Sequence, residues 1–353
     1  MKSEWKDFLV DAGAEFNDDR VAHFGNPVRE QQAALGGLVF ADLEYLGVIA
    51  VHGTDAASFL QSQLSNDIRS LDEHASQLSA FCTPKGRMLG LMRIFRCNDI
   101  YYLRLPADTL EAVLQRLRLF VMRAQVTLED VSENFLRIGV SGTDAPEQVH
   151  AATGACPETV NAVAQRGDFT VMRVPGPQPR FEIFAASLQA ARQCWDALNV
   201  RAAPAGEPVW RLLEILAGLP AVFAATRERF VPQMANLQLV DGVSFKKGCY
   251  PGQEIVARMQ YLGTLKRRMY AGRIALDGQV LPGAELFSGH DDSQPVGQIV
   301  DAQPHPDGGQ QALAVLQIRS AEADDAFLGS AAGPAFELVR LPYDFETESR
   351  QQQ

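Results

Sequence analysis

The hydrophobic pattern of the chain changes character twice. Between about residues 37 and 217, short apolar stretches typical of β-strands alternate with stretches at helical spacing. The strands expected here cover residues 48–51, 77–82, 87–95, 101–105, 135–140, 170–174 and 181–184. Helices are expected to begin after Thr54 or Asp55 and at Asp108, Leu188 and Glu207, and Gly218 and Pro220 end the last of them. The turn Thr83-Pro84-Lys85-Gly86 is expected to join two of the strands.

Both ends of the chain differ from this middle part. Residues 4–16 predict a short amphipathic helix, and the segment through Pro27 resembles a linker. Beyond Leu265, short strands at 268–276, 284–288, 296–301, 312–318 and 335–341 are separated by Gly, Pro and Asp clusters, which predicts a small antiparallel β-barrel. We therefore expect four parts: residues 1–30, a larger body of two subdomains over 31–264, a barrel over 265–345, and a disordered tail over 346–353.

Composition identifies a globular chain. Of its 353 residues, 46% are hydrophobic and 21% charged, which is ordinary for a folded protein of roughly two or three domains. No apolar run approaches the ~18–20 residues that span a bilayer. The start, residues 1–7, lacks the apolar core of a signal peptide and carries acidic residues. A cytoplasmic location without membrane attachment is the expectation.

Charge is distributed unevenly. The net charge of −11 argues against stable binding to nucleic acid. Between residues 244 and 273, however, seven basic residues stand against one acidic residue, a local charge of +6. A solvated basic surface is one interpretation, and a local anion site is the other. The five cysteines are scattered without a Cys-x-x-Cys pair, and the six histidines form no His-x-x-x-His pair, so no metal site is expected.

The densest chemistry lies in the stretch from Lys246 to Arg258. It reads Lys-Lys-Gly-Cys-Tyr-Pro-Gly-Gln-Glu-Ile-Val-Ala-Arg. Ammonium groups such as that of Lys247 favour the thiolate of a neighbouring cysteine, which is the reactive form of sulfur. Cys249 is therefore a candidate reactive thiol. The alternative is an ordinary turn in which Cys249 is a small buried apolar group.

The same stretch resembles the signature of the YgfZ family, folate-binding proteins related to the aminomethyltransferase GcvT of the glycine cleavage system. The resemblance extends to three basic residues at 266–268 and to the upstream segments 214–220, 230–237 and 242–245. Weaker similarity runs from about Gly36 to Tyr343. It implies an α+β, GcvT-like fold: a folate-binding domain of mixed subdomains over residues 31–264, followed by the C-terminal antiparallel β-barrel.

The resemblance also implies a ligand, tetrahydrofolate or another reduced folate. Trp210 stands where YgfZ proteins place a folate-contacting tryptophan, although packing in the core is the alternative for this residue. Tyr250 and Gln253 are further candidate folate contacts. Glu254 could accept hydrogen bonds from the pterin nitrogens and Arg258 could hold a carboxylate. Alternatively, Glu254 and Arg258 form an ordinary surface pair on a helix. The basic turn at residues 85–87 could lie near the same cavity or be a plain hairpin turn.

One departure from the parent family bears on activity. GcvT-type transferases carry paired aspartates where this chain has Gly90 and Leu91, and neither residue can move a proton. The expected function is thus tetrahydrofolate-dependent support of iron–sulfur cluster assembly or repair in client enzymes, which by resemblance include the radical enzyme that methylthiolates tRNA. A true aminomethyltransferase and a non-catalytic folate-sensing module are the alternatives.

Overall fold

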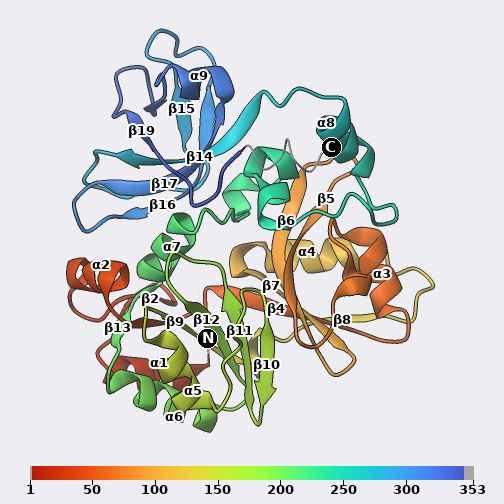
Figure 1. The fold of residues 1–353 in the computed structure, drawn as a ribbon, viewed down its shortest axis with the longest axis vertical. Coiled ribbons are helices and arrows are strands. Elements are labelled where there is room, and N and C mark those ends of the chain that lie inside the picture. The colour runs from red at the N-terminus through yellow and green to blue at the C-terminus, as the bar shows by residue number, and fades with distance from the viewer. Residues whose placement is uncertain (1, 346–353) are drawn as a thin grey trace.

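Residues 2–345 are described by a computed structural model, and they form three bodies, each built around one β-sheet (Figure 1). The first body has a six-stranded sheet in the order β10-β11-β12-β9-β3-β13, in which β13 runs parallel to β3 and the other neighbours are antiparallel. Its strands are β3 (Val39–Asp42), β9 (Leu136–Ser141), β10 (Val163–Arg166), β11 (Phe169–Val174), β12 (Arg180–Ala185) and β13 (Ala203–Ala205). Helices α5 (Ala145–Thr153) and α6 (Leu188–Asn199) pack on it.

The second body has a five-stranded antiparallel sheet in the order β5-β6-β7-β4-β8. Its strands are β4 (Leu46–His52), β5 (Ser76–Cys82), β6 (Met88–Cys97), β7 (Ile100–Pro106) and β8 (Thr127–Asp130). Helices α3 (Ala56–Gln63) and α4 (Ala107–Arg118) cover its core. The apolar residues of α4 recur at helical spacing, so burying that one face removes them from water.

The third body is an antiparallel sheet in the order β18-β15-β16-β17-β14-β19, which curls into a half-barrel (Figure 1). Its strands are β14 (Arg267–Ile274), β15 (Glu285–Phe287), β16 (Gly297–Pro304), β17 (Gln310–Gln317), β18 (Phe327–Leu328) and β19 (Phe336–Val339), and α9 (Ile318–Glu322) follows β17. The predicted α+β fold with a C-terminal antiparallel barrel is confirmed in the form of this half-barrel.

Two further helices connect the bodies. Helix α7 (Glu207–Leu216) lies at the centre of the molecule and contacts β3 of the first body as well as β16 and β17 of the half-barrel (Figure 1). Helix α8 (Gln253–Tyr261) lies beside the end of β5 and β6. Across residues 2–345, no helix has the length and apolar character needed to cross a bilayer.

The predicted strands and the helices at α3, α4, α6 and α7 are confirmed within one to three residues at most ends. The N-terminal region differs: helix α1 covers Ser3–Asp11, and the expected linker contains a hairpin of β1 (Glu15–Asn17) and β2 (Arg20–His23), followed by α2 (Pro27–Gly36). The linker prediction was wrong because the short strands of this hairpin carry too few apolar residues to show a period. The predicted tail at 346–353 lies outside the described residues.

Candidate functional site

Cys249 is exposed on the loop before helix α8, here called the thiol loop (residues 241–252). The start of this loop is fastened to the segment after helix α3. The Ser244 amide donates to the Ser65 carbonyl at 3.0 Å, and the Asn66 side chain donates to the Asp241 carbonyl at 2.6 Å. These bonds fix the backbone that leads to the thiol, so Cys249 projects from a fixed support.

Lys247, predicted to act beside the thiol, is buried, and its ammonium faces the end of helix α3. The Nζ donates to the carbonyl oxygens of Gln61, Leu64 and Asn66, at 2.6 Å for the first and 3.1 Å for the last. Burial lowers the pKa of Lys247 to about 8. An ammonium has three N–H donors, and these carbonyls occupy them. The structure therefore makes this side chain an anchor of the thiol loop, and its activation of the thiol stays a prediction.

Two glycines bring the thiol loop against the hairpin turn between β5 and β6. Gly252 has a φ of +82°, and a Cβ there would lie 2.4 Å from the Thr83 carbonyl oxygen and 2.7 Å from the Gly86 Cα. A larger residue would strain the backbone and push the two segments apart. Lys85 and Arg87 are exposed on this turn. The basic turn is thus a hairpin turn, and it lies directly beside the loop that carries the thiol.

The other predicted contacts of this motif lie around α8. Tyr250 is buried, with the Lys247 ammonium 5.1 Å from its ring centroid, and Gln253 is half-buried at the first position of α8. Glu254 and Arg258 form an ion pair at 3.6 Å, and their side chains are 83% and 65% exposed. This geometry matches the ordinary surface pair, which was one of the two alternatives that the sequence left open for Glu254 and Arg258. The predicted contacts of these residues with folate stay predictions.

Trp210 is completely buried on helix α7. The Arg180 guanidinium lies 4.5 Å from its ring centroid, and a Cβ on Gly139 would lie 2.6 Å from the ring. Because the indole is 0% exposed, a pterin would have to displace one of these neighbours to stack on it. The structure therefore matches the core-packing alternative for Trp210.

The basic segment of residues 244–273 is divided between two places. Lys246 and Arg258 are exposed near the thiol. Arg267 and Arg273 belong to strand β14 of the half-barrel, where they donate to the carbonyls of Pro295 and Gly308 at 3.3 and 3.0 Å. The local charge of +6 therefore does not form a single anion site.

A second polar region, which was not predicted from the sequence, lies where the sheets of the first two bodies meet helix α7. We call it the central charged cluster: Arg93 on β6, Arg104 on β7, Arg180 and Glu182 on β12, and Glu214 on α7. Arg104 binds Glu182 with Nη2 and, at 3.1 Å, with Nε. Glu214 lies 3.8 Å from Arg104 and 3.9 Å from Arg180, beyond hydrogen-bond distance. Three guanidiniums thus face two carboxylates.

Burial disfavours the charged forms of several groups in this cluster. Burial, with repulsion from Arg104, lowers the pKa of Arg93 to about 10. Burial also lowers the pKa of Arg180 and raises that of Glu214. The pKa of the neighbouring Tyr45 phenol is raised well above its usual value by burial and by Glu214. Groups whose charged forms are disfavoured in this way occur often at functional sites.

The cluster lines one cavity, and a second pocket shares a lining residue with that cavity. Tyr45, Arg93, Arg104 and Glu214 are among the residues lining a cavity of about 30 Å³, here called the central cavity. A pocket of about 260 Å³, here called the outer pocket, shares Leu219 with it and is also lined by Tyr343. The outer pocket is also lined by Asn161, whose Oδ1 accepts a hydrogen bond from Arg93 Nη1 at 2.7 Å. Asn161 therefore links the lining of the outer pocket to Arg93 of the central charged cluster.

The two positions that replace the paired acids face different ways. Leu91 lines the central cavity, whereas a Cβ on Gly90 would lie 2.7 Å from Val113 Cγ2, on the side of helix α4. Strand β6 thus presents an apolar side chain to the cavity at this point. The carboxylate that lines the cavity comes instead from Glu214.

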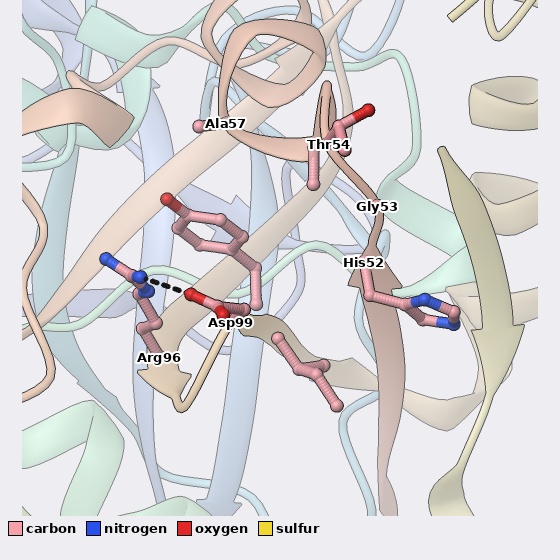
Figure 2. Close-up of a pocket in the computed structure, with 9 residues that line it drawn as sticks. His52, Gly53, Thr54, Ala57, Arg96 and Asp99 are labelled. Atoms are coloured by element: carbon pink, nitrogen blue, oxygen red, sulfur yellow. Dashed lines mark hydrogen bonds and ion pairs between the residues drawn. The ribbon is translucent and has the colours of Figure 1, made fainter. Parts of the chain in front are cut away.

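A larger hollow of about 560 Å³ lies elsewhere in the second body, between His52, Thr54, Arg96 and Tyr101 (Figure 2). Its arginine is already paired, because Arg96 Nη2 lies 2.8 Å from Asp99 Oδ1 (Figure 2). This hollow is larger than the central cavity, but the pKa of its arginine is raised by the hydrogen bond to Asp99, whereas burial lowers the pKa of Arg93 and Arg180 in the central charged cluster.

The cluster did carry a signal in the sequence. Arg93 interrupts the apolar run Leu-Met-Arg-Ile-Phe over residues 91–95, and Arg180 and Glu182 interrupt the run at 180–184. A charged residue in a strand buried on both faces needs a partner. The strands were predicted, but which strands lie together was not, so the partners stayed hidden.

Comparison with known proteins defines first the class and then the family. The fold is that of the glycine cleavage aminomethyltransferases: the aminomethyltransferase T from Bartonella henselae superposes with a TM-score of 0.79 over 96% of each chain, at 17% identity. A family model described as the GCVT N-terminal domain matches residues 12–241.

Closer relatives are curated bacterial proteins. The tRNA-modifying protein YgfZ from Colwellia psychrerythraea is 33% identical over 231 residues, covering 65% of this chain and 69% of the relative. The protein of the same name from an Enterobacter species is 30% identical over 314 residues, covering 88% and 94%. This chain belongs to the YgfZ family.

Proposed function

We propose that this protein binds a reduced folate and supports the assembly or repair of iron–sulfur clusters in client enzymes, with Cys249 as the thiol that contacts the client or its cluster. The observation that carries the proposal is the exposure of Cys249 on a thiol loop that buried contacts hold in place. The name shared by the two relatives supports clients among tRNA-modifying enzymes in a bacterial cytoplasm.

The folate is assigned to the outer pocket and the central cavity. Ligands commonly bind where several domains meet, and Glu214 retains accepting capacity because neither arginine is within hydrogen-bond distance. Its carboxylate could accept the N–H groups of a pterin ring. We assign the half-buried Gln253 and the exposed Glu254 and Arg258 to the surface that meets the client, since they lie on the helix after the thiol.

The test is deletion of the gene followed by rescue, with activities of several iron–sulfur enzymes as the readout. Wild-type protein should restore these activities and Cys249→Ala should not. Cys97→Ala is a matched control, because Cys97 is a half-buried thiol on strand β6. Full rescue by Cys249→Ala would contradict the proposal.

A folate-dependent aminomethyltransferase is the second candidate, and Glu214 is the observation that favours it, because it brings a carboxylate to the central cavity. Purified protein supplied with an aminomethylated lipoyl carrier and tetrahydrofolate should release no ammonia at an enzymatic rate. Turnover that disappears in Glu214→Gln would establish the transferase instead. Folate binding with no loss of rescue in Cys249→Ala would favour the sensing module.

A further inference from the structure

Arg96 holds a fixed position in the lining of the large hollow of the second body, here called the Tyr101 hollow (Figure 2). Its Nε donates to the Asn98 carbonyl at 2.9 Å, and its Nη2 donates to Asp99 Oδ1 at 2.8 Å. Two bonds from different nitrogens orient the planar guanidinium. Tyr101 is the cross-strand partner of Arg96, and the guanidinium carbon lies 5.7 Å from the centroid of the Tyr101 ring. Arg96 therefore lies beside both Asp99 and Tyr101, and all three residues line the hollow.

Two residues that line the Tyr101 hollow keep donors without protein acceptors. Tyr101 is 6% exposed, and among residues 2–345 its hydroxyl makes no hydrogen bond. The hydroxyl of a buried tyrosine usually finds a partner. Arg96 Nη1 likewise donates to no group of the described chain, since only Nε and Nη2 are engaged. Asp99 offers a complementary acceptor, because Arg96 occupies its Oδ1 and leaves Oδ2 free.

Much of the remaining lining is small or apolar. Gly53, Ala56 and Ala57 come from the start of helix α3, and Ile100 comes from β7. Figure 2 shows Gly53 across the hollow from Arg96. Small side chains leave space for the faces of a flat ring, and apolar side chains favour its burial. The volume of about 560 Å³ lies in the range of roughly 300–1,000 Å³ typical of small-molecule sites, so the hollow suits a flat ring with a polar edge.

The charges around the Tyr101 hollow favour an uncharged ligand. Arg96 and Asp99 form an ion pair, and the pKa of Arg96 is raised by its hydrogen bond to Asp99 and also by the nearby carboxylate of Glu73. The His52 ring lies 3.4 Å from Glu129 Oε2. The carboxylates near the hollow thus outnumber its guanidinium, and they would repel a phosphate group.

We propose that the Tyr101 hollow binds the base of a free purine nucleoside that carries a ring carbonyl, as inosine and guanosine do. With Arg96 as the middle group, Asp99 Oδ2, Arg96 Nη1 and the Tyr101 hydroxyl present one acceptor and then two donors. The edge of such a base presents the reverse order, a ring N–H, the carbonyl and a ring nitrogen, whereas adenine would place its amino donor opposite Arg96. This site goes beyond the proposed function, because it shares no lining residue with the central cavity or the outer pocket.

The first experiment compares the binding of inosine and of purine riboside by titration calorimetry. Purine riboside keeps the ring system and the sugar but lacks the carbonyl and the ring N–H beside it. Inosine should bind roughly tenfold more tightly or better, because purine riboside leaves Arg96 Nη1 and Asp99 Oδ2 unpaired. Equal affinities for the two nucleosides, or no binding of inosine at about 1 mM, would overturn the proposal.

Variants assign the binding to the Tyr101 hollow. Tyr101→Phe should weaken inosine binding severalfold and keep the melting temperature within about 2 °C of wild type, because the hydroxyl has no protein partner. Tyr102→Phe is the matched control, since the next side chain along β7 points to the other face of the sheet, where its ring centroid lies 5.2 Å from that of Phe95. Ala57→Leu keeps a good helix former, fills the hollow and should abolish binding. Inosine affinity that is unchanged in both Tyr101→Phe and Ala57→Leu would overturn the proposal.

Competition then separates this site from the folate site and from a nucleotide or RNA site. Saturating tetrahydrofolate should leave the inosine affinity unchanged, and displacement of inosine by tetrahydrofolate would overturn the proposal. Inosine 5′-monophosphate carries a phosphate, as an RNA chain does, and should bind no more tightly than inosine. Tighter binding of the monophosphate would overturn the assignment to a free nucleoside. Absence of tetrahydrofolate binding would overturn the proposed function, while the comparison of inosine with purine riboside would still decide the nucleoside site.

Discussion

The thiol loop and the central charged cluster use charged residues in opposite ways. In the thiol loop, the buried ammonium of Lys247 donates to three carbonyls, and on helix α8 directly after the loop the Glu254–Arg258 pair is exposed to solvent. In the central charged cluster, guanidiniums and carboxylates are buried together and Arg93 keeps an unpaired donor. The loop is thus a support whose buried charge is fully hydrogen-bonded, whereas the cluster contains buried donors without a protein partner among the described residues.

The largest expected effect separates buried from exposed ion pairs. Glu182→Gln should lower the free energy of unfolding by about 3–5 kcal/mol, because it leaves the buried Arg104 guanidinium without its carboxylate. Glu254→Gln, the matched change in the exposed pair, should alter it by no more than about 0.5 kcal/mol. Urea denaturation measures both values. Similar losses in the two variants would erase the proposed contrast.

Next in size is the anchor of the thiol loop. Lys247→Met should cost about 2–4 kcal/mol in unfolding free energy, because three buried carbonyls lose the ammonium that they accept from. Lys246→Met changes the neighbouring exposed lysine and should cost no more than about 0.5 kcal/mol. If Lys247→Met unfolds at the same urea concentration as wild type, the side chain is not an anchor.

The two regions also differ in how far the sequence could predict them. The motif around Cys249 is contiguous, so its thiol, its glycines and its basic neighbours could be recognised together. The acceptors of Lys247, however, lie more than 180 residues earlier in the chain, at Gln61 and Leu64, and no local pattern connects them. The same limit applies to Trp210, whose spacing on α7 predicts an inward position but not whether a ligand or Arg180 covers it.

Strand positions were predictable because apolar runs bounded by turn residues have a physical cause, the burial of one or both faces of a sheet. Which strands lie next to each other in the sheet could not be predicted, because β12 pairs with β9 and β3 pairs with β13 across long stretches of chain. The central charged cluster draws on strands of two sheets and on α7, so it became visible only once those elements were placed together.

A smaller effect, measured as a rate, concerns the cysteines. Cys249 should react first with a thiol reagent in the folded protein, since it is exposed, whereas Cys82 and Cys194 should react last. Burial raises the pKa of both buried thiols to about 12, which suppresses their thiolates. Cys249→Ala should remove the fastest phase and leave the free energy of unfolding within about 0.5 kcal/mol of wild type. Survival of the fastest phase in this variant would place the reactive thiol elsewhere.

The last prediction concerns the pH dependence of the anchor. Burial lowers the pKa of Lys247 from its ordinary 10.5 to about 8 in the folded state, so between pH 8 and 10.5 the unfolded chain binds more protons at this residue than the folded chain does. The free energy of unfolding should therefore rise with pH across that window because of Lys247. The unfavourable contribution from desolvation of its charged form is fully present below pH 8. The difference in unfolding free energy between wild type and Lys247→Met isolates this residue from the other groups that titrate in the same range. If this difference in unfolding free energy does not change from pH 8 to 10, the three carbonyls stabilise the ammonium as well as water does. Its hydrogen bonds would then fully offset its desolvation.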